Sequence, residues 1–248
     1  CVLGIVKLHN SSDIKAVLMH DYESFNPDLI CALAGVVGED NVLMVEPMKL
    51  HTTFKIGGPA DLLVKPQDPQ QLVRVLDTCT FAETPVTVVG NGSDLLVSDR
   101  GIRGVVVLLR ENMADVRIEG TRVIAQAGAL LRDVALAAAD AGLSGLEPLW
   151  GIPATVGGAC FMNAGAYGGQ TSDVLESVDV YVPSKRGQRG SVCTLDVDQL
   201  NMGYRKSRVN TDGLIVLSAT FKLTPDSPDA IRFAMDDFQA RREEKQPL

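Results

Sequence analysis

The sequence is poor in the residues that build metal centres, disulfide frameworks and membrane spans. It has three histidines and five cysteines, and no two of the cysteines have the C-x-x-C spacing. We therefore expect no metal site and no disulfide framework, and we take reduced thiols and a cytoplasmic location as the default. No apolar run reaches the roughly 18 residues of a membrane helix, so no membrane partner is expected.

Positive charge is also scarce. The 248 residues contain 23 Lys and Arg against 31 Asp and Glu, which gives a net charge of −8, and the basic residues are scattered. Nucleic-acid binding is therefore not expected. The first residue is Cys1 and the last, Leu248, directly follows a charged helical run, so we expect both ends to be cut, with Met19 as a natural start.

The pattern of apolar residues predicts an α+β protein with four parts. Asp68 followed by Pro69 is typical of a helix start, and the apolar run at 86–89 predicts a strand buried on both faces. A glycine turn between 116–118 and 122–126 predicts a hairpin. The parts are a lead-in (1–40), a βαβ layer (41–113 with strands 41–46, 61–66, 86–89 and 104–109), an antiparallel sheet with helices (114–225 with strands 177–182, 192–195 and 214–223 and a helix over 130–141) and a final helix (226–248).

A glycine-rich stretch, GIPATVGGACFMNAGAYGG, covers Gly151–Gly169. It contains too much glycine for an ordinary helix or strand interior and too many apolar residues for a flexible linker. Glycine lets a backbone approach a ligand closely, so the stretch offers many N–H donors to a flat, partly anionic cofactor. A set of tight turns in a compact fold explains the same residues equally well.

Two further glycine-rich segments follow or precede apolar strands. Gly90–Leu95 forms a turn in which backbone amides can bind an anion, although Leu95 occupies the third glycine position of the dinucleotide fingerprint. Thr52–Ala60 is the second segment. Each alone is also explained by a chain reversal, but the three segments together indicate a nucleotide-type cofactor held mostly by main chain.

Five motifs occur here in one order and together resemble the UDP-N-acetylenolpyruvoylglucosamine reductase family. The resemblance runs from about Glu46 to Leu248, and its motifs are HTTFKIGGPAD, VVGNGSDLLVSDRGIRGVVV, AGLSGLEPLWGIPATVGGACFMNAGAYGG, GYRKS and LIVLSATFKL. It implies an FAD-binding fold of the vanillyl-alcohol-oxidase type, with a small βαβ subdomain and an antiparallel-sheet subdomain. A third, substrate-binding domain of that family is expected to be absent from these 248 residues.

The resemblance also implies which residues hold the ligands. Arg205 matches the family's catalytic arginine, which stabilises the developing enolate, and Tyr167 and Lys245 match residues that contact the substrate. The matching FAD-binding positions are Gly90, Asn91, Gly92, Ser93, Asp94, Leu95, Gly151, Ile152, Pro153, Thr155, Val156, Gly157, Gly158 and Ile215. Without the resemblance, Arg205 would be assigned to a basic surface patch, Tyr167 to packing and Lys245 to a solvated helix face.

The implied reaction uses NADPH to reduce FAD, and the reduced flavin then reduces UDP-N-acetylglucosamine enolpyruvate to UDP-N-acetylmuramate for peptidoglycan synthesis. The family's proton donor is a serine in a Gly-Ser-x-Phe-Lys motif, which these 248 residues do not contain. We therefore expect a monomeric chain that retains FAD affinity but does not turn over substrate. Ala154 replaces a usual glycine, Asp94 replaces a common asparagine, and Trp150 can pack on either the turn or the flavin.

Two alternative functions remain open from the sequence. One is a flavin-dependent oxidase of the same fold acting on a sugar or alcohol, in which His51 or Cys160 are the only residues near the flavin segments for covalent attachment. The other is a flavin- or nucleotide-binding module without catalytic activity. Flavin that stays with acid-precipitated protein would favour the oxidase.

Overall fold

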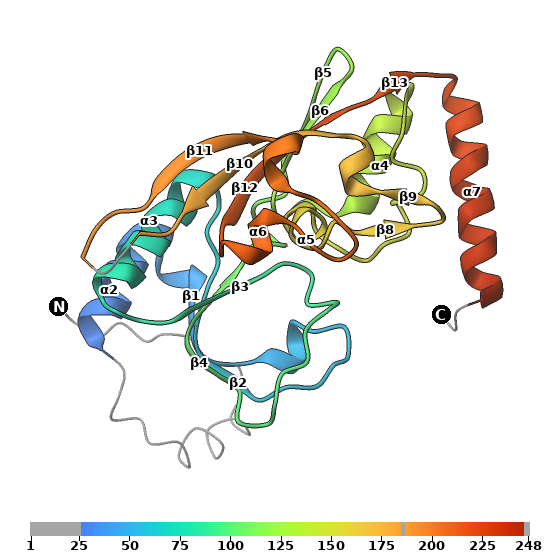
Figure 1. Cartoon of the computed structure of the whole chain (residues 1–248). Coiled ribbons are helices and arrows are strands. Elements are labelled where there is room, and N and C mark those ends of the chain that lie inside the picture. The colour runs from blue at the N-terminus through green and yellow to red at the C-terminus, as the bar shows by residue number, and fades with distance from the viewer. Residues whose placement is uncertain (1–25, 185–186, 246–248) are drawn as a thin grey trace. The chain divides into compact units, whose positions relative to one another are not determined.

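The computed structural model describes residues 26–184 and 187–245, which form two compact units (Figure 1). Within these residues, the first unit runs to Asn112 and includes the segment Pro183–Gly190. The second unit comprises Met113–Val182 and the chain from Ser191 onward. The sequence division at 113/114 lies one residue from this boundary, but the functions assigned to the parts remain predictions.

The first unit is built on a four-stranded mixed sheet. Its strands lie in the order β1-β2-β4-β3, with β1 antiparallel to β2 and the other neighbours parallel. The strands are β1 (Val42–Pro47), β2 (Pro59–Val64), β3 (Val86–Val89) and β4 (Ile102–Leu108). The chain passes from β2 through α3 (Pro69–Phe81) to β3, which is the βαβ crossover that the sequence predicted.

Both long helices of this unit begin in the same way. Asn26 and Asp68 cap α2 (Pro27–Val37) and α3, because their side chains accept hydrogen bonds from the backbone N–H groups of Asp28 and Gln71 at 3.0 and 2.7 Å. A proline follows each cap at the first helical position, where a missing N–H costs nothing. The helix start predicted at Asp68 and Pro69 is therefore confirmed.

The sheet buries its centre more than its edge. Leu63, Val106 and Leu108 form a core cluster on one face together with Met48, Ala60, Val89 and Val97. In β3 only Val89 is buried, and its first three residues are half-exposed. The prediction that 86–89 is buried on both faces is therefore wrong: β3 is an edge strand, so its outer side has no neighbouring strand to cover it.

The second unit contains a five-stranded antiparallel sheet, as the sequence predicted. The strand order is β11-β10-β12-β6-β5. The hairpin register pairs Glu119 with Arg122, so Gly120 and Thr121 form the turn, with φ of 61° at Gly120. The strands are β5 (Val116–Glu119), β6 (Arg122–Gln126), β10 (Leu175–Val182), β11 (Ser191–Asp196) and β12 (Ile215–Lys222).

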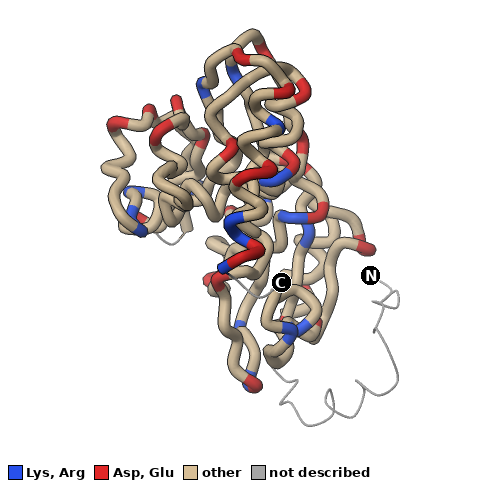
Figure 2. The backbone as a smooth tube through the Cα atoms, turned by 90° about the vertical axis from the view of Figure 1, so that its right-hand side faces the viewer, with Lys and Arg blue, Asp and Glu red and all other residues tan. Residues whose placement is uncertain are grey.

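Helices and short strand pairs complete the second unit (Figure 1). Helix α5 packs against β12, and α7 contacts both α4 and β7. Figure 2 shows acidic and basic residues interspersed along α7, near the C label. The helices are α4 (Leu131–Asp140), α5 (Val156–Met162), α6 (Arg208–Thr211) and α7 (Pro228–Lys245), and the short pairs are β7 (Leu143–Ser144) with β13 (Thr224–Pro225) and β8 (Gly165–Ala166) with β9 (Gly169–Gln170).

Helix α5 corrects a sequence expectation, because it lies inside the glycine-rich stretch that was judged unsuitable for a helix. Its start is fixed by Thr155, whose side chain accepts a hydrogen bond from the N–H of Gly158. A side chain at Gly157 would approach the carbonyl oxygen of Ala127 to 3.1 Å, so glycine here permits close packing of the helix on the backbone just after β6. None of the helices in the described part of the chain is both long and apolar enough to span a bilayer.

Candidate functional site

Two loops of the first unit meet around Gly92. The N–H of Thr53 donates to the carbonyl of Gly92 at 3.2 Å, which joins the loop after β1 to the loop after β3. Gly92 has φ of 61°, and a Cβ there would lie 2.1 Å from the carbonyl oxygen of His51. Only glycine fits this close approach. The structure therefore brings two of the three predicted glycine-rich segments together.

The loop after β1 reaches this position by folding back over the sheet. Met48, at the start of the 3₁₀ turn Met48–Leu50, is fully buried in the core cluster. Further along the loop, the N–H of Gly58 donates to the carbonyl of Ser98 at 2.9 Å. The core thus holds the first end of the loop after β1, and the loop after β3 holds its second end.

A pocket of about 480 Å³ opens beside these loops. Three of its lining residues, Lys49, Lys55 and Arg110, are cationic, and none of the described residues that line it is acidic. Such a lining favours an anionic ligand. The lining is Lys49, Leu50, His51, Thr52, Thr53, Lys55, Asn91 and Arg110, of which only Asn91 belongs to the predicted FAD-binding residues.

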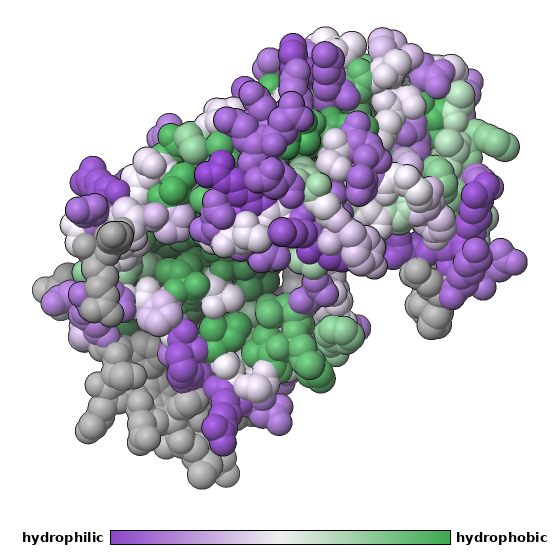
Figure 3. Space-filling model, in the orientation of Figure 1, coloured by the Kyte–Doolittle hydropathy of each residue, from purple (hydrophilic) through white to green (hydrophobic). Residues whose placement is uncertain are grey.

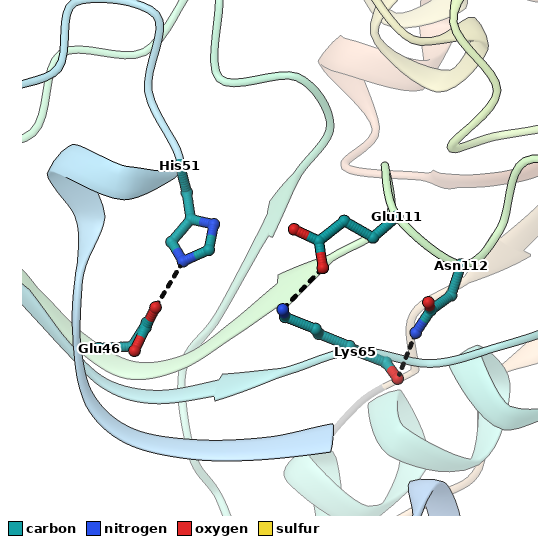
Figure 4. A network of polar contacts seen from close by, with 5 residues as sticks. All are labelled: Glu46, His51, Lys65, Glu111 and Asn112. Carbon is teal, nitrogen blue, oxygen red and sulfur yellow. Dashed lines mark hydrogen bonds and ion pairs between the residues drawn. The ribbon is translucent and has the colours of Figure 1, made fainter. Parts of the chain in front are cut away.

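A buried acid–base pair supports the pocket from behind. The Nε2 atom of His51 lies 2.8 Å from Oε1 of Glu46, and both side chains are more than nine-tenths buried. Figure 4 shows the other ring nitrogen of His51 directed away from Glu46. Since a buried carboxylate needs a partner, this contact satisfies Glu46 and holds the ring of His51 in the pocket wall.

The segment that carries Arg110 is held by a second pair. Lys65, just after β2, contacts Glu111 through Nζ and Oε2 at 2.7 Å, and Asn112 donates to the carbonyl of Lys65 (Figure 4). The carboxylate of Glu111 is half-exposed, so the pair adds little stability. Its consequence is local, because it fixes the backbone that follows β4.

The cations of the pocket were not predicted from the sequence. Lys49 lies two residues before the motif HTTFKIGGPAD, Lys55 lies inside this motif, and Arg110 comes two residues after the end of β4. The position of Arg110 carried a usable signal, because β3 and β4 are parallel and Gly90 and Arg110 follow their carboxyl ends. The two lysines gave no such signal in the sequence, because their position in the pocket depends on how the loop after β1 folds back over the sheet.

Apolar side chains surround the same loops. Leu50, Phe54, Ile56 and Leu96 are between 51% and 72% exposed. Figure 3 shows hydrophobic surface gathered over the lower part of the view, where these loops lie. An exposed apolar group next to cations suits a ligand that has both a ring system and an anionic group.

In the second unit, the segment from Gly151 to Gly158 leads into α5. Its glycines predicted many N–H donors available to a ligand, and this prediction is wrong for most of its length. The N–H groups of Ile152, Ala154, Val156, Gly157 and Gly158 already bind acceptors within the unit, at 2.8–3.4 Å. Contact between these residues and a ligand therefore depends on side chains, carbonyls and close backbone packing.

Alanine at position 154, where the family usually has glycine, causes no backbone strain. Ala154 is not among the described residues with positive φ. Its carbonyl accepts a hydrogen bond from the N–H of Leu131 at 3.0 Å. Alanine therefore replaces the family's usual glycine without cost to the backbone. Asp94 is exposed in its loop, so its carboxylate can point into solvent.

Arg205 lies on a tight turn between Gly203 and Lys206, whose backbone groups bond to each other at 2.9 and 3.2 Å. Arg205 is exposed and has φ of 52°, a conformation that non-glycine residues rarely adopt. Its guanidinium carbon lies 5.8 Å from the ring centre of Tyr204. Tyr204 is itself 92% exposed, so both side chains are available to a ligand.

Tyr167 and Trp150 both pack against α7. The Tyr167 ring lies 5.3 Å from that of Phe238, and Nε1 of Trp150 donates to the carbonyl of Met235 at 3.0 Å. Trp150 thus contacts α7, and its contact with the turn or with the flavin remains a prediction. Lys245 is exposed at the end of α7, and Ile215 is half-buried at the start of β12. Their predicted ligand roles remain predictions.

The cysteine that could attach a flavin covalently is inert. Cys160 lies on α5 with no exposed surface, and burial raises the pKa of its thiol to about 12. A protonated, inaccessible thiol does not react. Among the described residues, no group of three His, Cys, Asp or Glu side chains converges in the way a metal site requires.

Comparison with known proteins places this arrangement in a class. A family profile described as an FAD binding domain matches residues 60–187. Alkyldihydroxyacetonephosphate synthase shares the fold, with a TM-score of 0.61 at 18% identity over 83% of this chain and 42% of that one. The protein is therefore an FAD-binding flavoprotein with the α+β fold of the vanillyl-alcohol-oxidase type.

Closer relatives identify the family. The UDP-N-acetylenolpyruvoylglucosamine reductase of Clostridium botulinum (strain Hall) is 45% identical over 230 residues, which are 93% of this chain and 72% of the relative. The crystal structure of the reductase from Thermus caldophilus matches with a TM-score of 0.69 at 36% identity, over 84% of this chain and 70% of that one. The chain belongs to the UDP-N-acetylenolpyruvoylglucosamine reductase family.

Proposed function

We propose that this chain carries the FAD of a reductase that converts UDP-N-acetylglucosamine enolpyruvate to UDP-N-acetylmuramate in peptidoglycan synthesis, with NADPH as the reductant. The reaction is proposed to occur in the cytoplasm, in a monomer. Family membership supports the reaction. The single structural observation that carries the proposal is the cationic pocket beside Gly92.

The pocket fits the diphosphate of FAD. Lys49, Lys55 and Arg110 supply positive charge, and the glycine at position 92 lets two loops close around it. Charge-assisted hydrogen bonds to phosphate are stronger than neutral ones. Bound FAD supplies the hydride chemistry, and the role of these residues is to hold and orient it.

Arg205 is proposed to meet the carboxylate of the substrate. Its guanidinium is exposed on a turn whose ends are fixed. A planar guanidinium can bind a carboxylate through two parallel hydrogen bonds, and it stays charged at every physiological pH. Negative charge that develops next to this carboxylate would be stabilised by about 3 kcal/mol, by analogy with oxyanion donors.

The anion-binding role of the pocket can be tested with FAD itself. We expect Lys55→Ala and Arg110→Ala each to raise the dissociation constant for FAD about tenfold, because each removes a charged donor. The dissociation constant is measured by flavin fluorescence, and the effect should shrink at high salt. Lys222→Ala, an exposed lysine on β12, is the matched control. Unchanged affinity in both pocket variants would contradict the assignment.

The reductase activity is tested separately. A polypeptide of these 248 residues contains no Gly-Ser-x-Phe-Lys motif. We therefore expect NADPH to bleach the bound flavin without sustained NADPH oxidation when the enolpyruvyl sugar nucleotide is added. Sustained NADPH oxidation by this polypeptide in the presence of substrate would contradict the expectation that it does not turn over. Flavin that remains with acid-precipitated protein would support an oxidase instead.

A further inference from the structure

The turn that carries Arg205 has to be held in place by side chains. It spans only Gly203–Lys206, between the 3₁₀ turn Val197–Leu200 and the short helix α6. The positive φ at Arg205 costs free energy that the surroundings must offset. A mobile turn would not keep a guanidinium at a fixed distance from a reacting group, and misplacement by about 1 Å can cost a hundredfold in rate.

Two anchors connect this turn to the end of α5. At its start, Nδ2 of Asn163 donates to the carbonyl of Gly203 at 3.2 Å. At its end, the hydroxyl of Ser207 donates to the carbonyl of Phe161 at 2.7 Å. Ser207 is fully buried and Asn163 is 3% exposed. The last turn of α5 thus holds both ends of the segment that carries Arg205.

Asn163 is suited to this task in side chain and backbone. Its Nδ2 group also donates to Oε1 of Gln170 at 3.2 Å, and its Oδ1 accepts from the N–H of Ser172 at 3.0 Å. Both amide hydrogens and the oxygen are therefore used. Asn163 has φ of 44°, in the left-handed region that asparagine tolerates at a helix end. Asn163 therefore ends α5 and, through three side-chain hydrogen bonds, links this end to Gln170, Ser172 and Gly203.

We propose that Asn163 is a positioning residue that acts through Arg205. It fixes the Gly203–Lys206 turn so that the guanidinium meets the substrate carboxylate in one geometry. The inference rests on the proposed function for its link to substrate. The anchoring itself is independent of any ligand, because all its contacts lie within the second unit.

The anchoring is tested by hydrogen exchange without ligand. Asn163→Gly keeps the left-handed backbone but removes the three side-chain bonds, and Asn163→Asp keeps the shape and the acceptor but loses the donor. We expect both to speed exchange of the Lys206 N–H about tenfold, since its acceptor is the carbonyl that Asn163 also binds. Asn201→Gly places glycine at a similar φ of 46° near the same turn and should change exchange less than twofold.

The link to function is tested by a double-mutant cycle. Affinity for UDP-N-acetylglucosamine enolpyruvate is measured from the change in flavin absorbance of the FAD-loaded chain. We expect Asn163→Gly to weaken substrate binding about tenfold but to change it less than twofold when Arg205 is already alanine. FAD affinity should stay within twofold throughout.

Three results separate the possible failures. Unchanged exchange at Lys206 in both Asn163 variants, or equal acceleration by Asn201→Gly, would overturn the anchoring. An equal effect of Asn163→Gly with and without Arg205 would overturn action through Arg205. Faster exchange in the Asn163 variants, together with an unsubstituted chain that binds neither FAD nor the enolpyruvyl sugar nucleotide, would confirm the anchor and contradict the proposed function.

Discussion

At the scale of single residues, backbone conformation decides which side chains this protein can accept. Gly92 and Gly120 have the same φ of 61°, but their surroundings differ completely. A Cβ at Gly92 would lie 2.1 Å from the carbonyl oxygen of His51, whereas nothing lies within 4 Å of one at Gly120. The pair therefore separates the cost of the left-handed conformation from the cost of a steric clash.

We predict that Gly120→Ala lowers the free energy of unfolding by about 1 kcal/mol, because alanine disfavours positive φ. Gly92→Ala should lower it by several times as much and also weaken FAD binding, because the loops that form the pocket must separate. Urea unfolding and FAD fluorescence titration measure the two effects. Equal destabilisation by both substitutions would show that the clash at Gly92 is relieved without cost.

At the scale of elements, polar contacts between residues far apart in the sequence help to hold helices in place. Arg232 on α7, for example, forms an ion pair with Asp140 on α4. Trp150 is the clearest case, because its indole N–H reaches the carbonyl of Met235 on α7 across 85 residues of sequence. Arg132 on α4 also contacts this side chain, because its guanidinium carbon lies 6.0 Å from the centre of the Trp150 ring. Helix α7 otherwise buries only Ile231 and Met235 among its described residues.

Trp150→Phe should therefore loosen α7. We expect a loss of about 1 kcal/mol, the usual net contribution of one hydrogen bond, together with faster amide exchange along the helix. Phe233→Leu changes an aromatic residue on the same helix that is 78% exposed, and it should leave exchange unchanged. If α7 exchanged at the same rate in the Trp150 variant, packing against α4 and β7 would suffice to hold it.

At the scale of the whole molecule, acidic residues dominate, with a net charge of −8. Glu176 has a lowered pKa, first because it accepts a hydrogen bond from Arg122 and then through their charge attraction. This pair connects β10 to β6 across β12. A lowered pKa in the folded state means that the stabilisation is present above the ordinary value of 4.5 and is lost as pH falls through the folded value.

We therefore predict that Glu176→Gln is less stable than the parent chain near pH 7 and that the difference disappears well below pH 4.5. The effect should be small, since the pair is exposed to solvent. Thermal unfolding over a pH series measures it. Glu39→Gln removes the same charge in the other unit and serves as the control. A difference that persisted at low pH would assign the effect to packing and not to charge.

Local signals in the sequence predicted much of the fold. Asp68 with Pro69 marked a helix start, apolar segments and a glycine turn marked strands of the second sheet, and the ordered motifs indicated the family and FAD. These signals succeed because caps, turn residues and strand alternation act over a few residues. The helix at Val156–Met162 was missed because Gly157 suits close packing on the backbone of Ala127, just after β6, which no local pattern records.

By itself, the sequence indicated the family and the cofactor, but of the residues that line the pocket it indicated only Asn91. Only the tertiary structure decided which atoms meet. It folded the loop after β1 back to Gly92, placed Lys49 and Lys55 at one pocket, and occupied the N–H groups of Val156 and Gly157 with protein acceptors. The physical reason is that each of these outcomes depends on contacts between segments far apart in the chain, where burial and hydrogen bonding outweigh local preference.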